Sequence, residues 1–235
     1  MRSKINAVVG NFLAQKGYFI DRLYRKPEST LSTLSLGASI LDKSGRGLNI
    51  LQIGAFDGKF DDPLQWIIRK GRHSVLFVEP QIEPMKKLKE VYSEKDGFLF
   101  EQSAIFDYDG QAELYFHGRD MFAPTASLLK KHVSNFGIDV SKAKSQIVNC
   151  LTVESLLKKH DFFKIDLLQI DAEGLDLLIL KQFFFIDIEP NIINLETFHL
   201  SESDRNWLKS ELDSRGYARQ DAGLDTVAIK KNVLI

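Results

Sequence analysis

The clearest sign of chemistry in the sequence is a short glycine turn followed, further along the chain, by an acidic residue. The turn, Gly54–Gly58 (GAFDG), comes after the apolar run Leu48–Ile53, and Glu79 ends the next apolar run, 25 residues after Gly54. In a doubly wound α/β sheet, the ends of neighbouring strands lie side by side at one edge. Glu79 can therefore reach the turn and accept hydrogen bonds from both hydroxyls of a ribose.

The same turn lacks the features of the known phosphate-binding loops. An ATP-type loop needs four residues between its glycines and then Gly-Lys-Ser/Thr, whereas three residues separate Gly54 from Gly58, and Phe60 follows Lys59. A dinucleotide loop needs a third glycine, and Asp57 would repel a pyrophosphate at the helix N-terminus. Ribose recognition without phosphate recognition indicates a nucleoside-like cofactor, of which S-adenosylmethionine is the common one. The alternative is a tight strand–helix turn without a ligand.

Apolar runs alternate with helical patterns on both sides of the turn. Because these runs are apolar throughout, we expect a mostly parallel sheet with helices on both faces. Two short runs near the C-terminus predict a closing antiparallel pair. The predicted strands are Leu48–Ile53, Ser74–Val78, Gly97–Gln102, Asp166–Ile170, Asn191–Leu195, Gly216–Gln220 and Thr226–Lys230, and the predicted helices include Leu64–Lys70, Pro84–Lys95, Leu175–Phe184 and one that Ser201 opens.

Residues 107–151 interrupt this alternation and are expected to form an insertion carried by the main sheet. Gln111–Phe116 and Gln146–Leu151 are predicted strands, and Thr152 is predicted to cap a helix that runs through His160. Residues 117–145 are polar and irregular, and they leave the sheet at the edge where open α/β sheets bind ligands. We predict that they lie over this edge, with Met121–Val133 either a lid or an ordered loop.

Length and composition indicate a globular protein with one large domain. The chain has 235 residues, of which 44% are hydrophobic and 27% charged, and its net charge of −1 gives no basic field to attract nucleic acid. Residues 1–46 are expected to form an N-terminal helical segment and residues 47–235 the main domain. The apolar run Ala7–Ile20 is interrupted by polar residues and is too short to span a membrane. A single cysteine, Cys150, suits a reducing cytoplasm, the expected location.

Several short segments, spread in order along the chain, share the pattern of one known family. The most specific is IDLLQIDAEGLDLLILK (residues 165–181), which is similar to a motif usually written KIDVEG. Over roughly residues 48–230 the sequence resembles the FkbM family of S-adenosylmethionine-dependent methyltransferases. The other segments are ILQIGAFDGKFDDPL, VLFVEPQ, Ser103-Ala104-Ile105 with Asp109-Gly110, Leu151-Thr152-Val153, Asn191–Glu196, Gly216-Tyr217 and Asp225–Lys230.

The resemblance implies a Rossmann-like class I methyltransferase fold, with a seven-stranded, mostly parallel sheet, a terminal antiparallel hairpin and a β insertion after the third core strand. It implies that Gly54, Ala55 and Gly58 let the backbone approach the methionine moiety, and that Glu79 holds the ribose hydroxyls. Gln52 departs from the many methyltransferases that carry an acid near the methionine ammonium, since glutamine accepts a hydrogen bond but brings no charge. The candidate cofactor residues are Gln52, Gly54, Ala55, Phe56, Asp57, Gly58, Glu79, Pro80, Gln81 and Asp171, with Ser103 and Ala104 for the adenine pocket.

Asp171 and Glu173 end the fourth predicted strand, where the resemblance places the reacting methyl group. Enzymes that methylate exocyclic amines or glutamine amides carry Asn/Asp/Ser-Pro-Pro-Tyr/Phe at this strand end, and this sequence carries Asp-Ala-Glu-Gly. An acidic strand end suits the orientation of a hydroxyl, so O-methylation of a sugar, polysaccharide or other small metabolite is predicted. The alternative is a non-catalytic module that binds S-adenosylmethionine. The oligomeric state stays open.

A sugar hydroxyl is a poor nucleophile until a base removes its proton. A carboxylate such as Asp171 or Glu173, with a pKa of about 4, is a weak base unless burial raises that pKa. His199 has an intrinsic pKa of about 6.5, follows the fifth predicted strand, and has Glu196 nearby to orient it. We predict that His199 is the base and that Asp171 and Glu173 orient the acceptor. The alternative is that His199 only forms a hydrogen bond at the start of the helix that Ser201 opens.

No metal-ligating pattern stands out in the sequence. The remaining histidines, His132 among them, fall in loops or at helix ends and are expected at the surface. Asp176 is expected to cap the helix that follows it. The residues that could together hold a divalent cation are Asp171, Glu173, Asp176, Glu196 and His199, but they have no compact ligand spacing, so no metal site is predicted.

Overall fold

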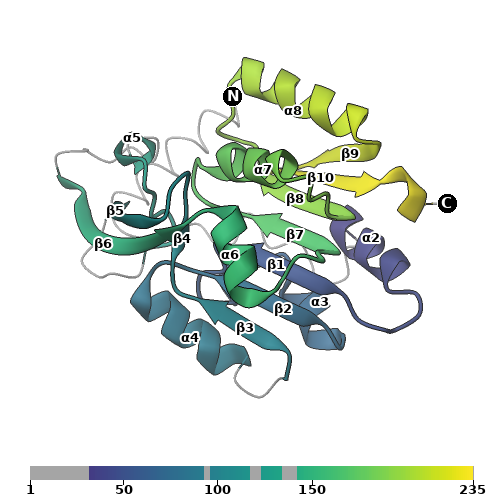
Figure 1. Ribbon diagram of the computed structural model, residues 1–235, viewed down its shortest axis with the longest axis horizontal. Coiled ribbons are helices and arrows are strands. Elements are labelled where there is room, and N and C mark those ends of the chain that lie inside the picture. The colour runs from purple at the N-terminus through teal and green to yellow at the C-terminus, as the bar shows by residue number, and fades with distance from the viewer. Residues whose placement is uncertain (1–31, 93–95, 117–122, 134–141, 235) are drawn as a thin grey trace, which may run out of the picture.

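The computed structural model describes residues 32–92, 96–116, 123–133 and 142–234, and one twisted sheet forms its centre (Figure 1). The sheet has seven strands in the order β3-β2-β1-β7-β8-β10-β9. Strands β3 to β8 of this order run parallel, whereas β10 is antiparallel to both of its neighbours, which confirms the predicted closing hairpin. The strands are β1 (Asn49–Ile53), β2 (Ser74–Val78), β3 (Phe98–Glu101), β7 (Leu167–Ile170), β8 (Ile192–Glu196), β9 (Tyr217–Ala222) and β10 (Asp225–Lys230).

Helices cover both faces of this sheet, as the apolar character of its strands predicted. Buried side chains of α2, α3 and α4 pack on one face, and those of α6, α7 and α8 pack on the other. Thr152 and Ser201 cap α6 and α8, since their hydroxyl oxygens accept backbone N–H bonds of 3.2 and 3.1 Å. The helices are α2 (Thr33–Leu41), α3 (Gln65–Lys70), α4 (Ile82–Tyr92), α6 (Val153–His160), α7 (Asp176–Phe185) and α8 (Glu202–Ser214), followed near the C-terminus by a short 3₁₀ helix, Lys231–Val233.

One helix boundary differs from the prediction for a clear physical reason. The helix predicted from Pro84 begins two residues earlier, at Ile82. A proline in the first turn of a helix removes an N–H group that has no partner within the helix. The proline is therefore tolerated inside α4 rather than marking its first residue.

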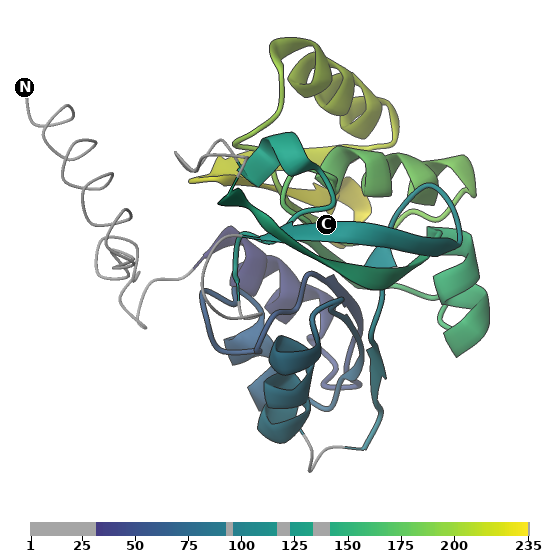
Figure 2. The same cartoon turned by 90° about the vertical axis from the view of Figure 1, so that its left-hand side faces the viewer.

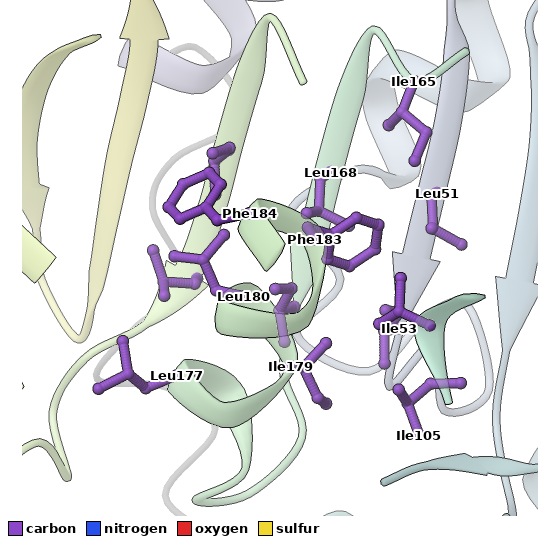
Figure 3. Close-up of a cluster of buried hydrophobic side chains, with 14 of the residues drawn as sticks. Leu51, Ile53, Ile105, Ile165, Leu168, Leu177, Ile179, Leu180, Phe183 and Phe184 are labelled. Carbon is purple, nitrogen blue, oxygen red and sulfur yellow. The ribbon is translucent and has the colours of Figure 1, made fainter. Parts of the chain in front are cut away.

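The core between the sheet and α7 fixes two neighbouring strands against each other. Figure 3 shows Phe183 of α7 beside Leu168 of β7 and near Leu51 of β1, and all three side chains are fully buried. Replacing a buried phenylalanine by alanine typically costs about 3–5 kcal/mol of stability. This packing matters for function because β1 and β7 carry, at their carboxyl ends, the glycine turn and the predicted acidic residues.

The insertion forms a separate three-stranded sheet, in the order β4-β6-β5, rather than an extension of the main one. It begins at β4 (Ala104–Ile105), a little before the expected start, because this short strand pairs with β6. Viewed from the carboxyl ends of the main strands, the small sheet and the short helix α5 lie in front of the main sheet (Figure 2). The remaining elements are β5 (Gly110–Phe116), α5 (Lys130–Val133) and β6 (Lys144–Leu151).

The helix predicted over Ala7–Ile20 lies outside the described residues. Of the predicted N-terminal segment, the described part contains α2, in which Leu34 and Ala38 are buried in the same core as β1 and β2. A Cβ on Gly37 would lie 2.6 Å from Ile229 of β10, so α2 packs closely on the sheet. Among the helices of the described residues, none is both long enough and apolar enough to cross a bilayer.

Candidate active site

The predicted turn lies where the ends of β1, β2 and β7 meet. The N–H groups of Gly54 and Ala55 both donate to the carbonyl oxygen of Val78, at 3.0 and 3.1 Å. Gly54 has a φ of +79°, and a Cβ at this position would lie 1.7 Å from the carbonyl oxygen of Asp171. Both the backbone conformation and this close approach require glycine. The turn is therefore fixed directly beside the strand end that carries the predicted acceptor residues.

Glu79 lies at this turn, as its place in the sequence predicted. Its Oε2 accepts the N–H of Phe56 at 3.0 Å, and its Oε1 accepts the N–H of Gln81 at 2.9 Å. The side chain is buried, and this burial raises the pKa of Glu79 to about 7, although the two backbone hydrogen bonds lower it. Each carboxylate oxygen has a second lone pair, so Glu79 can still accept hydrogen bonds from a ligand.

Gln52 forms a buried polar pair with Asp62, a residue that the sequence did not mark as part of the site. The Nε2 of Gln52 donates to Oδ1 of Asp62 at 3.0 Å. The other two oxygens of the pair, Gln52 Oε1 and Asp62 Oδ2, are buried and lack a hydrogen-bond partner within the described residues. Burial raises the pKa of Asp62 to about 6. Oxygen acceptors of this kind suit an ammonium group, and Asp62 places a carboxyl beside Gln52, with the hydroxyl of Tyr92 also interacting with that carboxyl.

The side chain of Gln81 forms hydrogen bonds to the backbone of the insertion and so joins the insertion to the end of β2. Its Nε2 donates to the carbonyl of Ala123 at 3.0 Å, and its Oε1 accepts the N–H of the same residue at 3.1 Å. The predicted insertion therefore does reach the carboxyl edge of the main sheet, through its described residues 123–133. Residues 117–122 and 134–141 of the predicted segment lie outside the described residues.

Most other predicted cofactor residues are also held by internal contacts. Ser103 donates to Oε1 of Glu101 at 2.7 Å, and Ala104 lies in β4. A Cβ on Gly58 would lie 2.7 Å from Leu88, so this glycine makes room for α4. Their roles toward a cofactor stay predictions. The remaining three are Phe56, which is buried with a φ of +45°, Asp57, whose Oδ1 accepts the N–H groups of Lys59 and Phe60, and Pro80, which is half-buried.

Acidic side chains gather at the ends of β7 and β8. Asp171 is exposed at this edge, and the loss of water around its carboxyl, together with the nearby carboxyls of Glu173, Asp176, Glu196 and Asp225, raises its pKa well above the usual range. Burial raises the pKa of Glu196 to about 8, and the carboxyls of Glu173, Asp176 and Asp225 raise it further. Asp176 accepts the N–H groups of Ala172 and Gly174 at 3.0 and 3.1 Å, so it stabilises the bend between β7 and α7, close to its predicted capping role.

His199 lies at the same edge, with Glu196 beside it as predicted and a second histidine in contact. Its Nε2 is 3.6 Å from Oε2 of Glu196, and its ring centroid is 4.4 Å from that of His132. Burial, followed by the nearby His132, lowers the pKa of His199. The expectation that His132 lies at the surface is wrong, because α5 of the insertion carries it into the site, where it is 5% exposed. The same expectation is wrong for His73, which is buried and accepts the N–H of Leu48 at 3.0 Å.

A strained bend presents Glu173 to His132. Glu173 has a φ of +50°, a conformation that non-glycine residues rarely adopt, and Ser127 of the insertion donates to its carbonyl oxygen at 2.7 Å. The next residue, Gly174, has a φ of +97°, and a Cβ there would lie 2.6 Å from Nδ1 of His132. His132 Nε2 is therefore able to lie 3.0 Å from Oε2 of Glu173. The sequence signal for His132 was its place in the segment predicted to cover this edge.

Comparisons with known proteins bear on this arrangement. The model of the methyltransferase FkbM domain matches residues 52–218, which is more than half of the chain. No curated protein matches the sequence. Similar solved structures include methyltransferase FkbM from Methylobacillus flagellatus, with 12% identity, a TM-score of 0.49, and coverage of 82% of this chain and 47% of that one. The chain thus spans about half the length of that relative.

Two further solved structures are similar to this chain, and both have low sequence identity to it. Ribosomal protein L11 methylase from Lactobacillus delbrueckii has 15% identity and a TM-score of 0.42, with 84% of this chain and 79% of that chain covered. Magnesium protoporphyrin IX methyltransferase from Synechocystis, solved with bound S-adenosylmethionine, has 12% identity and a TM-score of 0.41, with 96% and 97% covered. The family therefore rests on the match over residues 52–218, together with the strand order.

The site fits the cofactor of that family. The fixed turn at Gly54, the buried carboxyl of Glu79, and the unsatisfied acceptors on Gln52 and Asp62 offer a backbone cradle, a diol acceptor and an ammonium acceptor. S-adenosylmethionine carries the complementary groups, namely a ribose diol and a methionine ammonium. The chain belongs to the FkbM family of S-adenosylmethionine-dependent methyltransferases.

Proposed function

We propose that this chain transfers a methyl group to a hydroxyl oxygen of a sugar, a polysaccharide or another small hydroxylated metabolite. The observation that supports this choice is the edge formed by β7 and β8, beside the glycine turn. It carries the carboxyls of Asp171 and Glu173 and the imidazole of His199. It lacks the Pro-Pro-aromatic sequence that enzymes acting on amides and base amines carry at this strand end. Carboxyl and imidazole groups suit hydrogen bonding to hydroxyls.

The residues around β1 and β2 would hold the cofactor. Glu79 is proposed to accept both ribose hydroxyls, and Gln52 and Asp62 are proposed to accept the methionine ammonium. Gly54 lets the turn lie directly against the carbonyl of Asp171, because it has no side chain, and this contact fixes the turn that is proposed to face the ligand. S-adenosylmethionine supplies a methyl group on a sulfonium, so that the acceptor oxygen gains the methyl, the sulfur keeps the electron pair of the broken bond, and the hydroxyl proton leaves.

The residues at the ends of β7 and β8 would hold the acceptor. Asp171 and Glu173 are proposed to orient its hydroxyl, and Ala123, Ser127 and His132 of the insertion hold the segment that covers part of this edge. Burial, followed by the nearby His132, lowers the pKa of His199, which favours the neutral imidazole. A lone pair here can receive the hydroxyl proton, or it can bind a cation that holds the hydroxyl oxygen. Both uses require His199 for turnover and not for cofactor binding.

The test is an assay of S-adenosylhomocysteine release over a panel of mono- and oligosaccharides, polysaccharides and hydroxylated metabolites, with amide and amine acceptors as controls. Turnover with a hydroxyl acceptor, together with detection of the methyl ether in the product, is the expected result. Methylation of only amide or amine acceptors would overturn the proposal. Binding of S-adenosylmethionine without turnover on any acceptor would favour the non-catalytic binding module.

Two variants sharpen this assay. Glu79→Ala should lose cofactor binding and turnover together, because it removes the proposed ribose acceptor. Glu83→Ala removes an exposed glutamate four residues further along the chain, in the first turn of α4, and should change neither. Comparing the two variants distinguishes loss of the proposed ribose contact from a general loss of negative charge near β2.

A further inference from the structure

Three side chains that are far apart in the sequence converge at the acceptor edge. His132 comes from α5 of the insertion, Glu173 from the bend after β7, and His199 from the loop after β8. One nitrogen of each histidine and one carboxylate oxygen of Glu173 all lie within 4.8 Å of one another. In a tetrahedral site with bonds of about 2.1 Å, two ligand atoms are about 3.4 Å apart, so small side-chain rotations would suffice to surround one ion.

The local backbone supports this convergence. Glu173 adopts a left-handed conformation. The next residue is Gly174, and glycine is the residue type that leaves room for the His132 ring at this position. Ser127, also from the insertion, fixes the carbonyl of Glu173. Strained residues of this kind cluster at functional sites, because the surrounding structure must maintain them. A surface ion pair between a histidine and a glutamate would not require such an arrangement.

The surroundings are also favourable for a cation. Glu196, Asp171 and Asp176 lie close enough to one another and to Glu173 for their charges to interact. Glu196 Oε2 lies 3.6 Å from Nε2 of His199, which is longer than a hydrogen bond, and this buried oxygen has no hydrogen-bond partner within the described residues. The side chains of Glu173 and His199 are each 16% exposed, so the cluster is open on one side while His132 is buried. A bound ion would therefore keep coordination positions for a substrate.

We propose that His132, Glu173 and His199 bind one divalent transition-metal ion. Two imidazole nitrogens and one carboxylate oxygen suit Zn²⁺, Mn²⁺ or Fe²⁺ better than Mg²⁺ or Ca²⁺, which prefer oxygen ligands. Three protein ligands leave the open position that is typical of catalytic sites rather than of structural ones.

The role of the ion rests on the proposed function: it binds the acceptor hydroxyl beside the methyl donor. A bound cation withdraws electron density from that oxygen, and the hydroxyl proton passes to water as the oxygen takes the methyl group. The oxidation state of the ion does not change. In this arrangement His199 acts as a ligand and not as the base that the sequence predicted, because its lone pair is used in coordination.

The test measures binding of the metal alone to the full chain, after removal of any histidine tag and dialysis against a chelator. Zn²⁺, Mn²⁺ and Co²⁺ are titrated by calorimetry, bound metal is counted by mass spectrometry, and the absorption spectrum of Co²⁺ reports nitrogen and oxygen coordination. We expect about one ion per chain and at least about 100-fold weaker binding in His132→Ala and in His199→Ala. If His132→Ala does not fold, Glu173→Gln combined with His199→Asn tests the same site at partly exposed positions.

The matched control is the pair formed by His160 and Glu101, whose Nε2 and Oε2 atoms are 2.7 Å apart outside the cluster. His160→Ala removes a histidine from a His–Glu contact and should leave metal binding unchanged. Equal binding to the wild type and to the double variant His132→Ala/His199→Ala, or no binding at all, would overturn the site and leave a hydrogen-bonded cluster. An ion lost equally in His160→Ala would overturn it too.

The two proposals fail in different ways. Metal that binds in the absence of cofactor and acceptor, and that Glu79→Ala retains, supports the site even where no acceptor is methylated. Turnover that persists after chelation, with no ion bound, overturns the metal site and leaves the methyl transfer intact. Turnover that falls on chelation and returns with the ion, at unchanged S-adenosylmethionine affinity, supports both.

Discussion

The Nε2 atom of His132 lies 3.0 Å from Oε2 of Glu173, so a residue of the insertion is bound directly to the end of the fourth parallel strand of the main sheet. This contact exists because Gly174 has no side chain to occupy the space that the imidazole fills. The glycine of the family-like Asp-Ala-Glu-Gly segment thus has a structural purpose that involves a distant part of the chain.

Gly174→Ala should displace His132 and reduce turnover by about tenfold or more, because the added Cβ would lie 2.6 Å from its ring. The control is Gly216→Ala. Gly216 has a φ of +75°, similar in kind to the +97° of Gly174, but a Cβ there meets nothing within 4 Å. Both variants should lose about 1 kcal/mol of stability to backbone strain, measured by urea unfolding. Equal turnover in the two variants would show that the space beside His132 is unimportant.

Glu79→Ala should weaken S-adenosylmethionine binding by several kcal/mol, since each hydrogen bond to a charged group contributes about 1.5–3 kcal/mol. Calorimetry with S-adenosylmethionine and S-adenosylhomocysteine measures the loss, and Glu83→Ala serves as the control. Unchanged affinity would refute the ribose assignment. Tighter binding of NAD than of S-adenosylmethionine would contradict the cofactor itself.

Glu79 should also make stability depend on pH in a defined direction. Burial raises its folded pKa from 4.5 to about 7, so the folded state holds the proton more tightly than the unfolded state does. This contribution is fully present below pH 4.5 and is lost as the pH rises through 7. The free energy of unfolding of the wild type should therefore fall between pH 5 and pH 8 relative to Glu79→Gln, by at most about 3 kcal/mol. Urea denaturation of both proteins without cofactor measures this, and parallel curves would contradict it.

Asp62→Asn should weaken S-adenosylmethionine binding about tenfold or more, because it removes the negative charge proposed to face the methionine ammonium beside Gln52. Asn keeps the shape and one oxygen acceptor, so the Gln52 contact at Oδ1 need not be lost. Asp61→Asn changes the neighbouring, exposed acid and is the matched control. A large drop in thermal stability with unchanged cofactor affinity would show that the Gln52–Asp62 pair is structural only.

His199→Ala should lower turnover by about 10²–10⁴-fold while cofactor affinity stays nearly the same. The reason is its position in the loop after β8, whereas the turn proposed to bind the cofactor follows β1. Single-turnover rates and calorimetry measure the two effects separately. Turnover within a few-fold of the wild type would move its role to the carboxylates, and loss of cofactor binding would show that His199 is structural.

The main sheet, most of its helices and the turn of the proposed cofactor site could be predicted from local patterns in the sequence. Leu48–Ile53 and Ser74–Val78 are mostly apolar and do not alternate with polar residues, because helices cover both faces of a parallel strand. This pattern can be recognised in the sequence alone. Gly54 and Glu79 were found for a similar reason. Adjacent parallel strands end at one edge, so the places of the two residues along the chain were enough to bring them together.

The contribution of the insertion to the site depends on packing between distant segments, so the sequence did not predict it. His132 looked like a surface residue because nothing local marks it, and its burial depends on contacts with Glu173 and Gly174, about 40 residues away. Asp62 accepts the N–H of Leu64 at 2.8 Å, close to the start of α3, and its unsatisfied oxygen is apparent only beside Gln52 in the folded chain. Local patterns encode the strands and turns, which depend on backbone preferences and on the burial of a whole face. The clustering of ligand atoms depends on how separate segments pack in space, and no spacing along the chain records it.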